Sequence, residues 1–437
     1  MQTFRFSIAR RWAGLLLALC LAACGRPSPT VTPTPAATPT VTMTPSPTLT
    51  PTPSPTATLA PSTRAQARIL AGYYAGWSAD RYPVSAIPAD LLTHVFYAFA
   101  NVSPSGECVA SDPAQDEANW QALQALKQAH PQLKVLLSVG GWSQSGLFSD
   151  VAATAAARTH FAESCAAFVQ AHGFDGLDVD WEFPVSGGLA GNHTRPEDGL
   201  NFTALLAELR RALTAQAAAD SAAGGAAGGR RYLLTIAAPA GPAEYKHLEL
   251  RLIQQSVDWI NLMAYDFYTG ESPLTNFNAP LFPSASDPAP ADQRESHTVA
   301  AAVQAYLAAG VPGRKLVLGA PFYGRGWQGV PAANDGLYQT NTGPAQGSFA
   351  ADGIFSYGDL ESRFAISSTH HVQAEAQVPW IYDPVSQTFV TYEDPASLGL
   401  KADYAVGQNL AGVMFWELSM DDAQHSLVNA LHLHLGK

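Results

Sequence analysis

Positive charge is scarce in this sequence. Its 437 residues include 24 Lys and Arg against 36 Asp and Glu, which gives a formal net charge of −12. Binding of nucleic acid needs clustered Lys and Arg to neutralise phosphates, and the sequence has no such cluster. The composition therefore excludes a nucleic-acid partner and leaves uncharged partners open.

Long apolar runs are absent after residue 23, so no later segment is expected to cross a membrane. Near the start, three arginines precede the apolar run Trp12–Ala23, which is too short to span a bilayer and is typical of an export signal. The run ends in Leu-Ala-Ala-Cys-Gly at residues 21–25, which resembles a bacterial lipobox. This resemblance implies removal of residues 1–23 and lipidation of Cys24, which would anchor the protein on an outer surface. The alternative is an ordinary signal peptide with a chance cysteine.

Cysteine is also scarce, with four residues in the chain. Cys20 lies in the predicted signal and Cys24 would carry the lipid, so Cys108 and Cys165 are left in an oxidising compartment. The sequence allows either one disulfide or two buried free thiols.

Residues 24–65 lack almost everything that builds a core. From Pro27 to about Thr63 the chain is nearly all Pro, Thr, Ser, Ala and Val, without charge. Such a segment is expected to form an extended, polyproline-rich stalk. We interpret it as a passive linker that holds the next domain away from the lipid surface.

After Ala65 the pattern changes, and residues 66–437 are predicted to form one catalytic domain. Short β-branched and aromatic runs alternate with Ala- and Leu-rich helical stretches, as in repeated βα units. Eight such runs predict an α/β protein with a (β/α)₈ barrel. The predicted strands are Ile69–Tyr74, His94–Ala100, Lys134–Gly140, Gly173–Phe183, Tyr232–Pro239, Val257–Phe267, Lys315–Tyr323 and Gly412–Leu418.

The spacing is uneven only between the last two predicted strands. A small α+β insertion is therefore expected at about residues 327–382, before a seventh helix at Pro395–Asn409. Residues Ala217–Arg230, rich in Ala and Gly, are predicted to be a frayed helix end and a flexible loop. A closing helix is expected at Asp422–Leu435.

The most informative segment is Gly173–Phe183, which contains acids at alternate positions. On a strand, Asp178, Asp180 and Glu182 would share one face, which in a closed barrel is the interior. Because carboxylates crowded there repel one another and lose hydration, at least one is expected to hold its proton near neutral pH, as a general acid must. Glu182, nearest the carboxyl end of the strand, would lie closest to a substrate.

A solvated acidic edge or a Ca²⁺ site is the alternative interpretation of these acids. Flanking aromatic and bulky aliphatic residues make a poor cation cage, so we expect no metal.

The segment resembles the DxxDxDxE signature of family 18 chitinases, with Asp175, Asp178, Asp180 and Glu182 at its acidic positions. Three further segments resemble other strand ends of that family, in order along the chain. They are Ser138-Val139-Gly140-Gly141, Met263-Ala264-Tyr265-Asp266 and Met414-Phe415-Trp416-Glu417. Four motifs in order on predicted strand ends are specific, and many of these chitinases carry an insertion before the eighth strand.

The resemblance implies roles for individual residues. Glu182 would protonate the leaving oxygen, Asp180 would stabilise the intermediate formed by the sugar's own acetamido group, and Asp178 would share a proton with Asp180. Tyr265 would support the acetamido oxygen, and Asp266 would contact either the distorted sugar or Glu182. Remaining substrate contacts or supports are expected at Trp416, Tyr73, Ser138, Phe99, Trp142, Tyr323, Arg325, Met263 and Trp77, and structural roles at Asp175, Gly140 and Gly141. Tyr74 competes with Tyr73 for the inward position.

The implied activity is retaining hydrolysis of β-1,4 bonds between N-acetylglucosamine units of chitin, by a monomer without a cofactor. Two alternatives stay open: another enzyme acting on an acetamido polymer, such as an endo-β-N-acetylglucosaminidase or a peptidoglycan-fragment hydrolase, and a surface chitin-binding lectin. Lectins of the family typically lose the acid that Glu182 supplies. Asn192 and Asn201 match a glycosylation pattern, but beside a bacterial lipobox we interpret them as loop and helix-cap residues.

Overall fold

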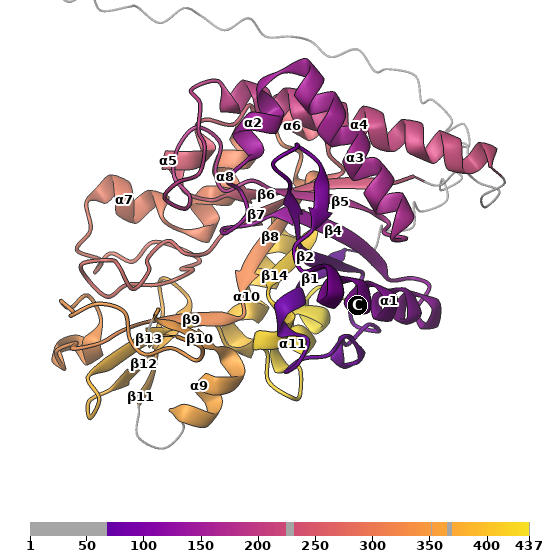
Figure 1. Ribbon diagram of the computed structural model, residues 1–437. Coiled ribbons are helices and arrows are strands. Elements are labelled where there is room, and N and C mark those ends of the chain that lie inside the picture. Colours follow the sequence, from indigo (N-terminus) through magenta and orange to yellow (C-terminus); the bar gives the residue numbers. More distant parts are fainter. Residues whose placement is uncertain (1–67, 224–230, 351, 365–368, 437) are drawn as a thin grey trace, which may run out of the picture. The chain divides into compact units, whose positions relative to one another are not determined.

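Residues 68–223, 231–350, 352–364 and 369–436 are described by the computed structural model. Eight parallel strands form a barrel in the order β1-β14-β8-β7-β6-β5-β4-β2, closed by pairing of β2 with β1 (Figure 1). The predicted (β/α)₈ barrel is confirmed. Its strands are β1 (Ile69–Ala75), β2 (His94–Val102), β4 (Lys134–Gly140), β5 (Gly176–Asp180), β6 (Leu233–Pro239), β7 (Trp259–Met263), β8 (Leu316–Pro321) and β14 (Gly412–Trp416). The short β3 (Cys108–Ala110) pairs antiparallel with β2.

Helices follow the strands and cover the barrel. They are α1 (Pro113–Ala129), α2 (Phe148–Ala153), α3 (Ala155–Ala171), α4 (Asp198–Ala222), α5 (Pro242–Tyr245), α6 (Leu250–Ser256), α7 (Ala291–Ser296), α8 (Val299–Ala308), α10 (Pro395–Gly407) and α11 (Ser426–His434). Single 3₁₀ turns lie at Gly76–Ser78, Val84–Ala86, Gly313–Lys315, Ala333–Gly336 and Leu418–Met420. Side chains of Asp112, Thr154, Thr298 and Asp394 cap α1, α3, α8 and α10 by accepting a backbone N–H bond, as N-cap residues do.

The core has two layers because strand side chains alternate in direction. In β5, Leu177 and Val179 point outward and join a large cluster with helix residues such as Phe161 and Leu205. A smaller cluster, which includes Phe96 and several other inward-facing strand residues, fills the barrel interior. In β5 the inward positions nearest its carboxyl end are occupied by the acids Asp178 and Asp180. This face of the strand therefore does not contribute to the apolar packing of the interior.

Five of the predicted strands are longer than the observed strands, and the differences are largest in two of them. The predicted Gly173–Phe183 ends at Asp180, and the predicted Val257–Phe267 ends at Met263. In both cases the chain leaves the sheet at its carboxyl end while the pattern of apolar and polar residues continues. Glu182 and Tyr265 therefore lie just beyond strands rather than on them.

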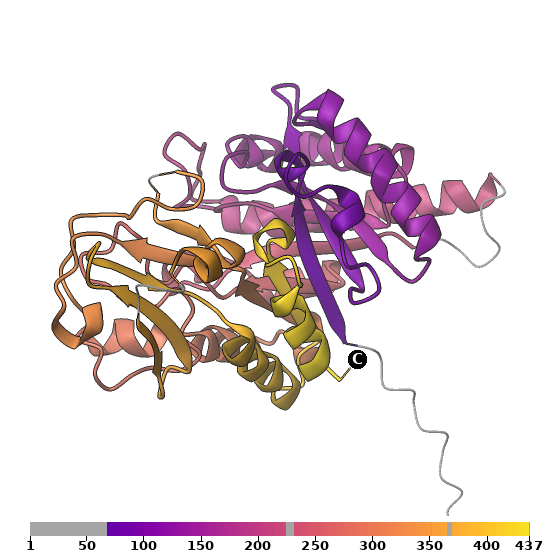
Figure 2. The same cartoon turned by 90° about the horizontal axis from the view of Figure 1, so that it is seen from below.

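A separate antiparallel sheet lies between β8 and β14 in the chain, and Figure 2 shows it in orange to gold beside the barrel. Its order is β10-β9-β13-β12-β11. The strands are β9 (Tyr323–Trp327), β10 (Ile354–Ser356), β11 (Thr369–Gln373), β12 (Val378–Asp383) and β13 (Thr388–Thr391), with α9 (Tyr357–Arg363) alongside. The sheet is wider than the expected 327–382 at both ends, because β9 begins two residues after β8 and the sequence does not show the break.

The helical predictions differ from the structure in their bounds. Helix α4 runs to Ala222, past the predicted fraying point, and residues 224–230 lie outside the described part. Asn201 lies inside the first turn of α4, whose cap is Glu197, so the prediction that it caps a helix is wrong. The segments expected at 395–409 and 422–435 form α10 and α11.

Cys108 and Cys165 are buried free thiols. Burial raises the pKa of the Cys165 thiol, and the neighbouring Cys108 raises it further. None of the helices in the described part of the chain is long and apolar enough to cross a membrane. The predicted export signal, Cys24 and the predicted stalk lie outside the described residues.

Candidate active site

Asp178 lies inside the barrel, where each of its two carboxylate oxygens accepts two hydrogen bonds. Its Oδ2 accepts hydrogen bonds from Tyr73 (2.9 Å) and Ser138 (2.8 Å). Its Oδ1 accepts from Thr235 (2.6 Å) and Asn261 (3.2 Å). These four donors come from β1, β4, β6 and β7, so the barrel as a whole fixes this carboxylate.

Tyr73, the first choice for the inward position of β1, is the residue that reaches Asp178. Tyr74 points outward, where its hydroxyl donates to the carbonyl of Tyr82 at 3.1 Å. Alternation along the strand thus separates two adjacent tyrosines that the sequence alone left open.

Asp180 is one inward position closer to the mouth of the barrel. Burial raises its pKa well above the ordinary value, and the carboxylates of Glu182 and Asp178 raise it further. Burial also raises the pKa of Asp178, against the lowering effect of its four hydrogen bonds. The pKa values of both carboxyls are thus shifted in the direction that favours the protonated form. Among the described residues, Asp180 Oδ1 is a buried side-chain oxygen that has no hydrogen-bond partner.

Gly140, at the end of β4, lets the chain approach Asp180 closely. Its φ of +109° is a conformation that favours glycine, and a Cβ there would lie 2.2 Å from the carbonyl oxygen of Asp180. The next residue, Gly141, donates its N–H to the same oxygen at 2.8 Å. The two glycines therefore set the distance between β4 and the acidic end of β5.

Glu182 lies at the mouth of the barrel, next to Asp180 in the cleft. Burial raises the pKa of its carboxyl to about 8, and the charge of Asp266 contributes in the same direction. At neutral pH this carboxyl is therefore mostly protonated. A half-buried, protonated glutamic acid open to a cleft has the properties of a general acid.

The cleft at the carboxyl ends of the strands has a volume of about 1120 Å³. Its aromatic lining includes Trp416, whose ring stacks on Phe99 with centroids 5.6 Å apart. Trp77 and Trp142, half-exposed, also line it. Flat apolar rings beside carboxylates are suited to the apolar faces of sugar rings.

Asp266 connects the barrel to the second sheet. Arg325 of β9 contacts both carboxylate oxygens, with Nε at 2.8 Å and Nη2 at 2.7 Å, and Tyr323 donates to Oδ1 at 2.9 Å. The N–H of Asp266 donates to Asn278 Oδ1 at 2.8 Å. Tyr265, Met263 and this cluster all line the cleft.

Tyr323 and Arg325 were expected at or beyond the end of the seventh barrel strand. They lie instead in β9 of the second sheet, because β8 ends at Pro321. The wall of the cleft at this point is thus built by that sheet.

Asp175, the first acid of the motif, lies far from this chemistry. It precedes β5 at the opposite end of the barrel, where its Oδ2 accepts from the N–H of Val135 at 2.9 Å and pairs with Lys127 at 2.8 Å. Its contacts are those of a structural residue.

Thr235, Asn261 and Asn278 were missed by the sequence analysis, although each bonds a predicted site residue. The signal for the first two was present, since each is a polar residue at an inward position of an otherwise apolar strand. Asn278 lies in a loop, where no periodicity marks it.

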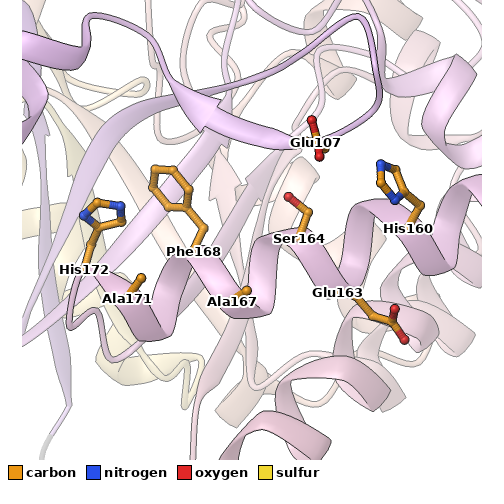
Figure 3. A pocket seen from close by; sticks show the side chains of 8 residues that line it. All are labelled: Glu107, His160, Glu163, Ser164, Ala167, Phe168, Ala171 and His172. Carbon is orange, nitrogen blue, oxygen red and sulfur yellow. The ribbon is translucent and has the colours of Figure 1, made fainter.

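A second cavity of about 420 Å³ lies outside the barrel along α3 (Figure 3). Its lining residues are Glu107, His160, Glu163, Ser164, Ala167, Phe168, Ala171 and His172. None of the motif acids lines this cavity, whereas Asp180 and Glu182 line the barrel cleft. The candidate active site is therefore the barrel cleft. In the described part of the chain, no three His, Cys, Asp or Glu side chains are arranged to hold a metal ion.

A parallel barrel with buried acids and aromatic rings at the carboxyl ends of its strands is typical of enzymes that act on sugar polymers. Comparison with known proteins narrows this class: the family described as Glycosyl hydrolases family 18 matches residues 69–421. The chain therefore belongs to glycosyl hydrolase family 18.

Individual relatives agree with the family match. Chitinase A1 of Niallia circulans is 39% identical over 415 residues, which cover 84% of this chain and 58% of that protein. This chain thus spans little more than half of that relative. A chitinase of Bacillus thuringiensis superimposes with a TM-score of 0.78 at 34% identity, covering 85% of this chain and 70% of that one. A family 18 N-acetylglucosaminidase of Paenibacillus barengoltzii gives 0.72 at 34% identity, covering 84% and 99%.

Proposed function

We propose that this protein hydrolyses β-1,4 bonds between N-acetylglucosamine units of chitin or its oligomers, with retention of configuration and without a cofactor. The observation that carries the proposal is Glu182, a half-buried carboxyl with a pKa of about 8 that lines an aromatic-lined cleft together with Asp180. The similarity to two chitinases supports the choice of substrate.

In the proposed mechanism the substrate supplies its own nucleophile. Glu182 donates its proton to the glycosidic oxygen as the bond to the anomeric carbon breaks, and the acetamido oxygen of the same sugar attacks that carbon. The resulting oxazolinium ion carries positive charge. Glu182, now a carboxylate, takes a proton from a water molecule that opens the ring and restores the original anomer.

Asp180 and Asp178 serve the charged intermediate in this proposal. The carboxylate of Asp180, which lines the cleft, accepts the acetamido N–H, and its negative charge stabilises the oxazolinium ion. Asp178 shares a proton with Asp180 in this proposal and so sets the charge of Asp180, while its four hydrogen-bond donors hold its carboxyl in place.

The other cleft residues bind and orient the sugar. The Tyr265 hydroxyl supports the acetamido oxygen, and Trp416 forms the apolar floor under the reacting ring. Asp266 contacts the distorted sugar. Arg325 and Tyr323 hold the Asp266 carboxylate in place. Phe99, Trp142 and Trp77 extend the aromatic surface to neighbouring sugars.

A second candidate keeps this mechanism and changes the product or the polymer. The similarity to an N-acetylglucosaminidase favours release of single sugars, and other acetamido polymers such as peptidoglycan fragments offer the same reacting group. The lengths of the products distinguish these cases from cleavage within a chitin chain.

The proposal is tested with N-acetylglucosamine oligomers of defined length and, as matched controls, fully deacetylated and cellulose oligomers of the same lengths. We expect short β-anomeric products from the acetylated oligomers alone, because the other two lack the acetamido nucleophile. Efficient cleavage of cellulose oligomers, or α-anomeric products, would contradict the assisted mechanism.

We also propose that the protein is exported as a monomeric lipoprotein, anchored through Cys24 and carried on the stalk of residues 24–65. The lipobox-like sequence and the Pro- and Thr-rich composition support this proposal. The expected result is a membrane-bound chain released by detergent and not by salt, and a Cys24→Ala chain that is not membrane-bound. A Cys24→Ala chain that stays in the membrane fraction would refute the anchor.

A further inference from the structure

The main chain of Glu182 lies outside the sheet that positions the other two acids. β5 ends at Asp180, so the ladder of the barrel no longer holds the backbone two residues later. Two side chains from other segments take its place. The N–H of Glu182 donates to Ser145 Oγ at 2.9 Å, and its carbonyl oxygen accepts from Asn192 Nδ2 at 3.0 Å. Contacts on both sides of one residue fix the direction in which its side chain leaves the backbone.

Ser145 is itself fixed, because it is fully buried in the turn after β4. Its hydroxyl lies 2.9 Å from the carbonyl of Gly141 and 3.1 Å from that of Asp180. A hydroxyl has one proton and can accept as well, so it donates to one carbonyl at a time while accepting from Glu182. Ser145 thus links the carboxyl ends of β4 and β5 to the main chain of Glu182.

Asn192 is held by its own neighbours in the loop 183–197. The N–H of His193 donates to the carbonyl of Gly146 at 3.1 Å. Arg195 pairs with Asp150 at 2.7 Å. The Asn192 amide is therefore anchored to the segment that follows Ser145, independently of Glu182.

The loop also passes directly over the carbonyl that Asn192 binds. A Cβ at Gly188 would lie 2.1 Å from the carbonyl oxygen of Glu182, and the glycine has a φ of +73°. Such a close approach leaves the carbonyl little room to move. The loop backbone and the Asn192 amide thus act on the same atom.

We propose that Ser145 and Asn192 are positioning residues that act on catalysis through the main chain of Glu182. Neither lines the cleft, so neither touches substrate. The inference rests on the proposed role of Glu182 as general acid. It assigns a purpose to the Asn192 triplet, which the sequence analysis interpreted as an ordinary loop feature.

The first test is Asn192→Ala and Asn192→Asp, assayed on N-acetylglucosamine oligomers. A slight misplacement of a catalytic group is enough to lower the rate of the chemical step. We expect kcat to fall about tenfold in Asn192→Ala, on the scale of one lost hydrogen bond, and further in Asn192→Asp, whose carboxylate would face the carbonyl. KM is expected to stay within about twofold, since substrate contacts are unchanged.

The pH profile gives a readout that general destabilisation would not move. Glu182 must be protonated to act, so activity is held below its pKa of about 8 and lost as the pH rises through it. A carboxyl freed from its position is less buried, and its pKa falls towards the ordinary value. We therefore expect the alkaline limb of kcat/KM, which reports the free enzyme, to move to lower pH in both variants.

The matched control is His193→Ala, which loses the contact with Asp150 but keeps the Asn192 amide and the Arg195 pair. Its kcat is expected within about twofold of wild type, with an unmoved alkaline limb. Ser145→Ala is the second variant and is expected to repeat the Asn192→Ala result, because the N–H of Glu182 loses its acceptor. Melting temperatures of all variants show whether each chain is folded at the assay temperature.

Two results would overturn the inference. One is wild-type kcat and pH profile in a folded Asn192→Ala or Ser145→Ala chain. The other is a loss in His193→Ala equal to that in Asn192→Ala, which would assign the effect to the loop in general. A wild-type chain that cleaves no acetylated oligomer would instead refute the proposed function, and this inference with it.

Discussion

Replacing Glu182 with Gln is expected to lower kcat on N-acetylglucosamine oligomers by about 10³-fold or more, on the scale of what a general acid contributes. The amide keeps the size of the side chain and its place in the cleft but has no proton to give to the glycosidic oxygen. Because the site has no other acid in that position, water would have to protonate the leaving group. Initial rates measured with a sensitive product assay give the ratio.

Binding separates loss of chemistry from loss of structure in this experiment. Glu182→Gln keeps the aromatic floor and the Asp266 cluster, so its affinity for a long acetylated oligomer, measured by calorimetry, is expected to stay within a few-fold of wild type. A variant that still cleaves at more than about a tenth of the wild-type rate would sink the assignment of Glu182 as the acid. If wild type and variant both bind without cleaving, the protein is a lectin.

Asp180→Asn is expected to lower kcat by about 10²-fold, the scale of one preorganised electrostatic contact to a developing charge. The substitution keeps the shape of the side chain but removes the negative charge that would face the oxazolinium ion. It also ends proton sharing with Asp178, whose pKa is raised by burial. Single-turnover rates on a defined oligomer isolate the chemical step.

Asp175→Asn is the matched control, since Asp175 belongs to the same motif but contacts Lys127 and Val135 away from the cleft. It is expected to lower the melting temperature and to leave kcat within a few-fold of wild type. Equal losses of kcat in the two variants would mean that the charge of Asp180 has no special part in the reaction.

The fold was largely readable from the sequence because the barrel repeats one pattern. Strands such as Lys134–Gly140, buried on both faces, are short apolar runs with recognisable limits, and the prediction for that strand matches β4. The predicted ends of β5 and β7 were wrong, because in these two segments the pattern of apolar and polar residues continues after the sheet ends.

The acids of the site were visible because three carboxylates on one face of the predicted strand Gly173–Phe183 are hard to explain by packing. The residues that serve them were less visible. Thr235 and Asn261 each lie on a different strand from Asp178, and the pairing and curvature of the sheet bring all three together. Asn278 and Asn192 lie in loops, where no period relates a residue to its partner.

The sequence by itself thus determined the repeated βα architecture, the order of the four motifs and the identity of the acids, because these depend on residue type and on spacing along one segment. Only the tertiary structure decided which of Tyr73 and Tyr74 faces inward, that Arg325 of the second sheet holds Asp266, and that Ser145 and Asn192 fix Glu182. The physical reason is that the strength of a hydrogen bond or ion pair depends on distance and angle, and between distant segments these are set by the folded chain alone.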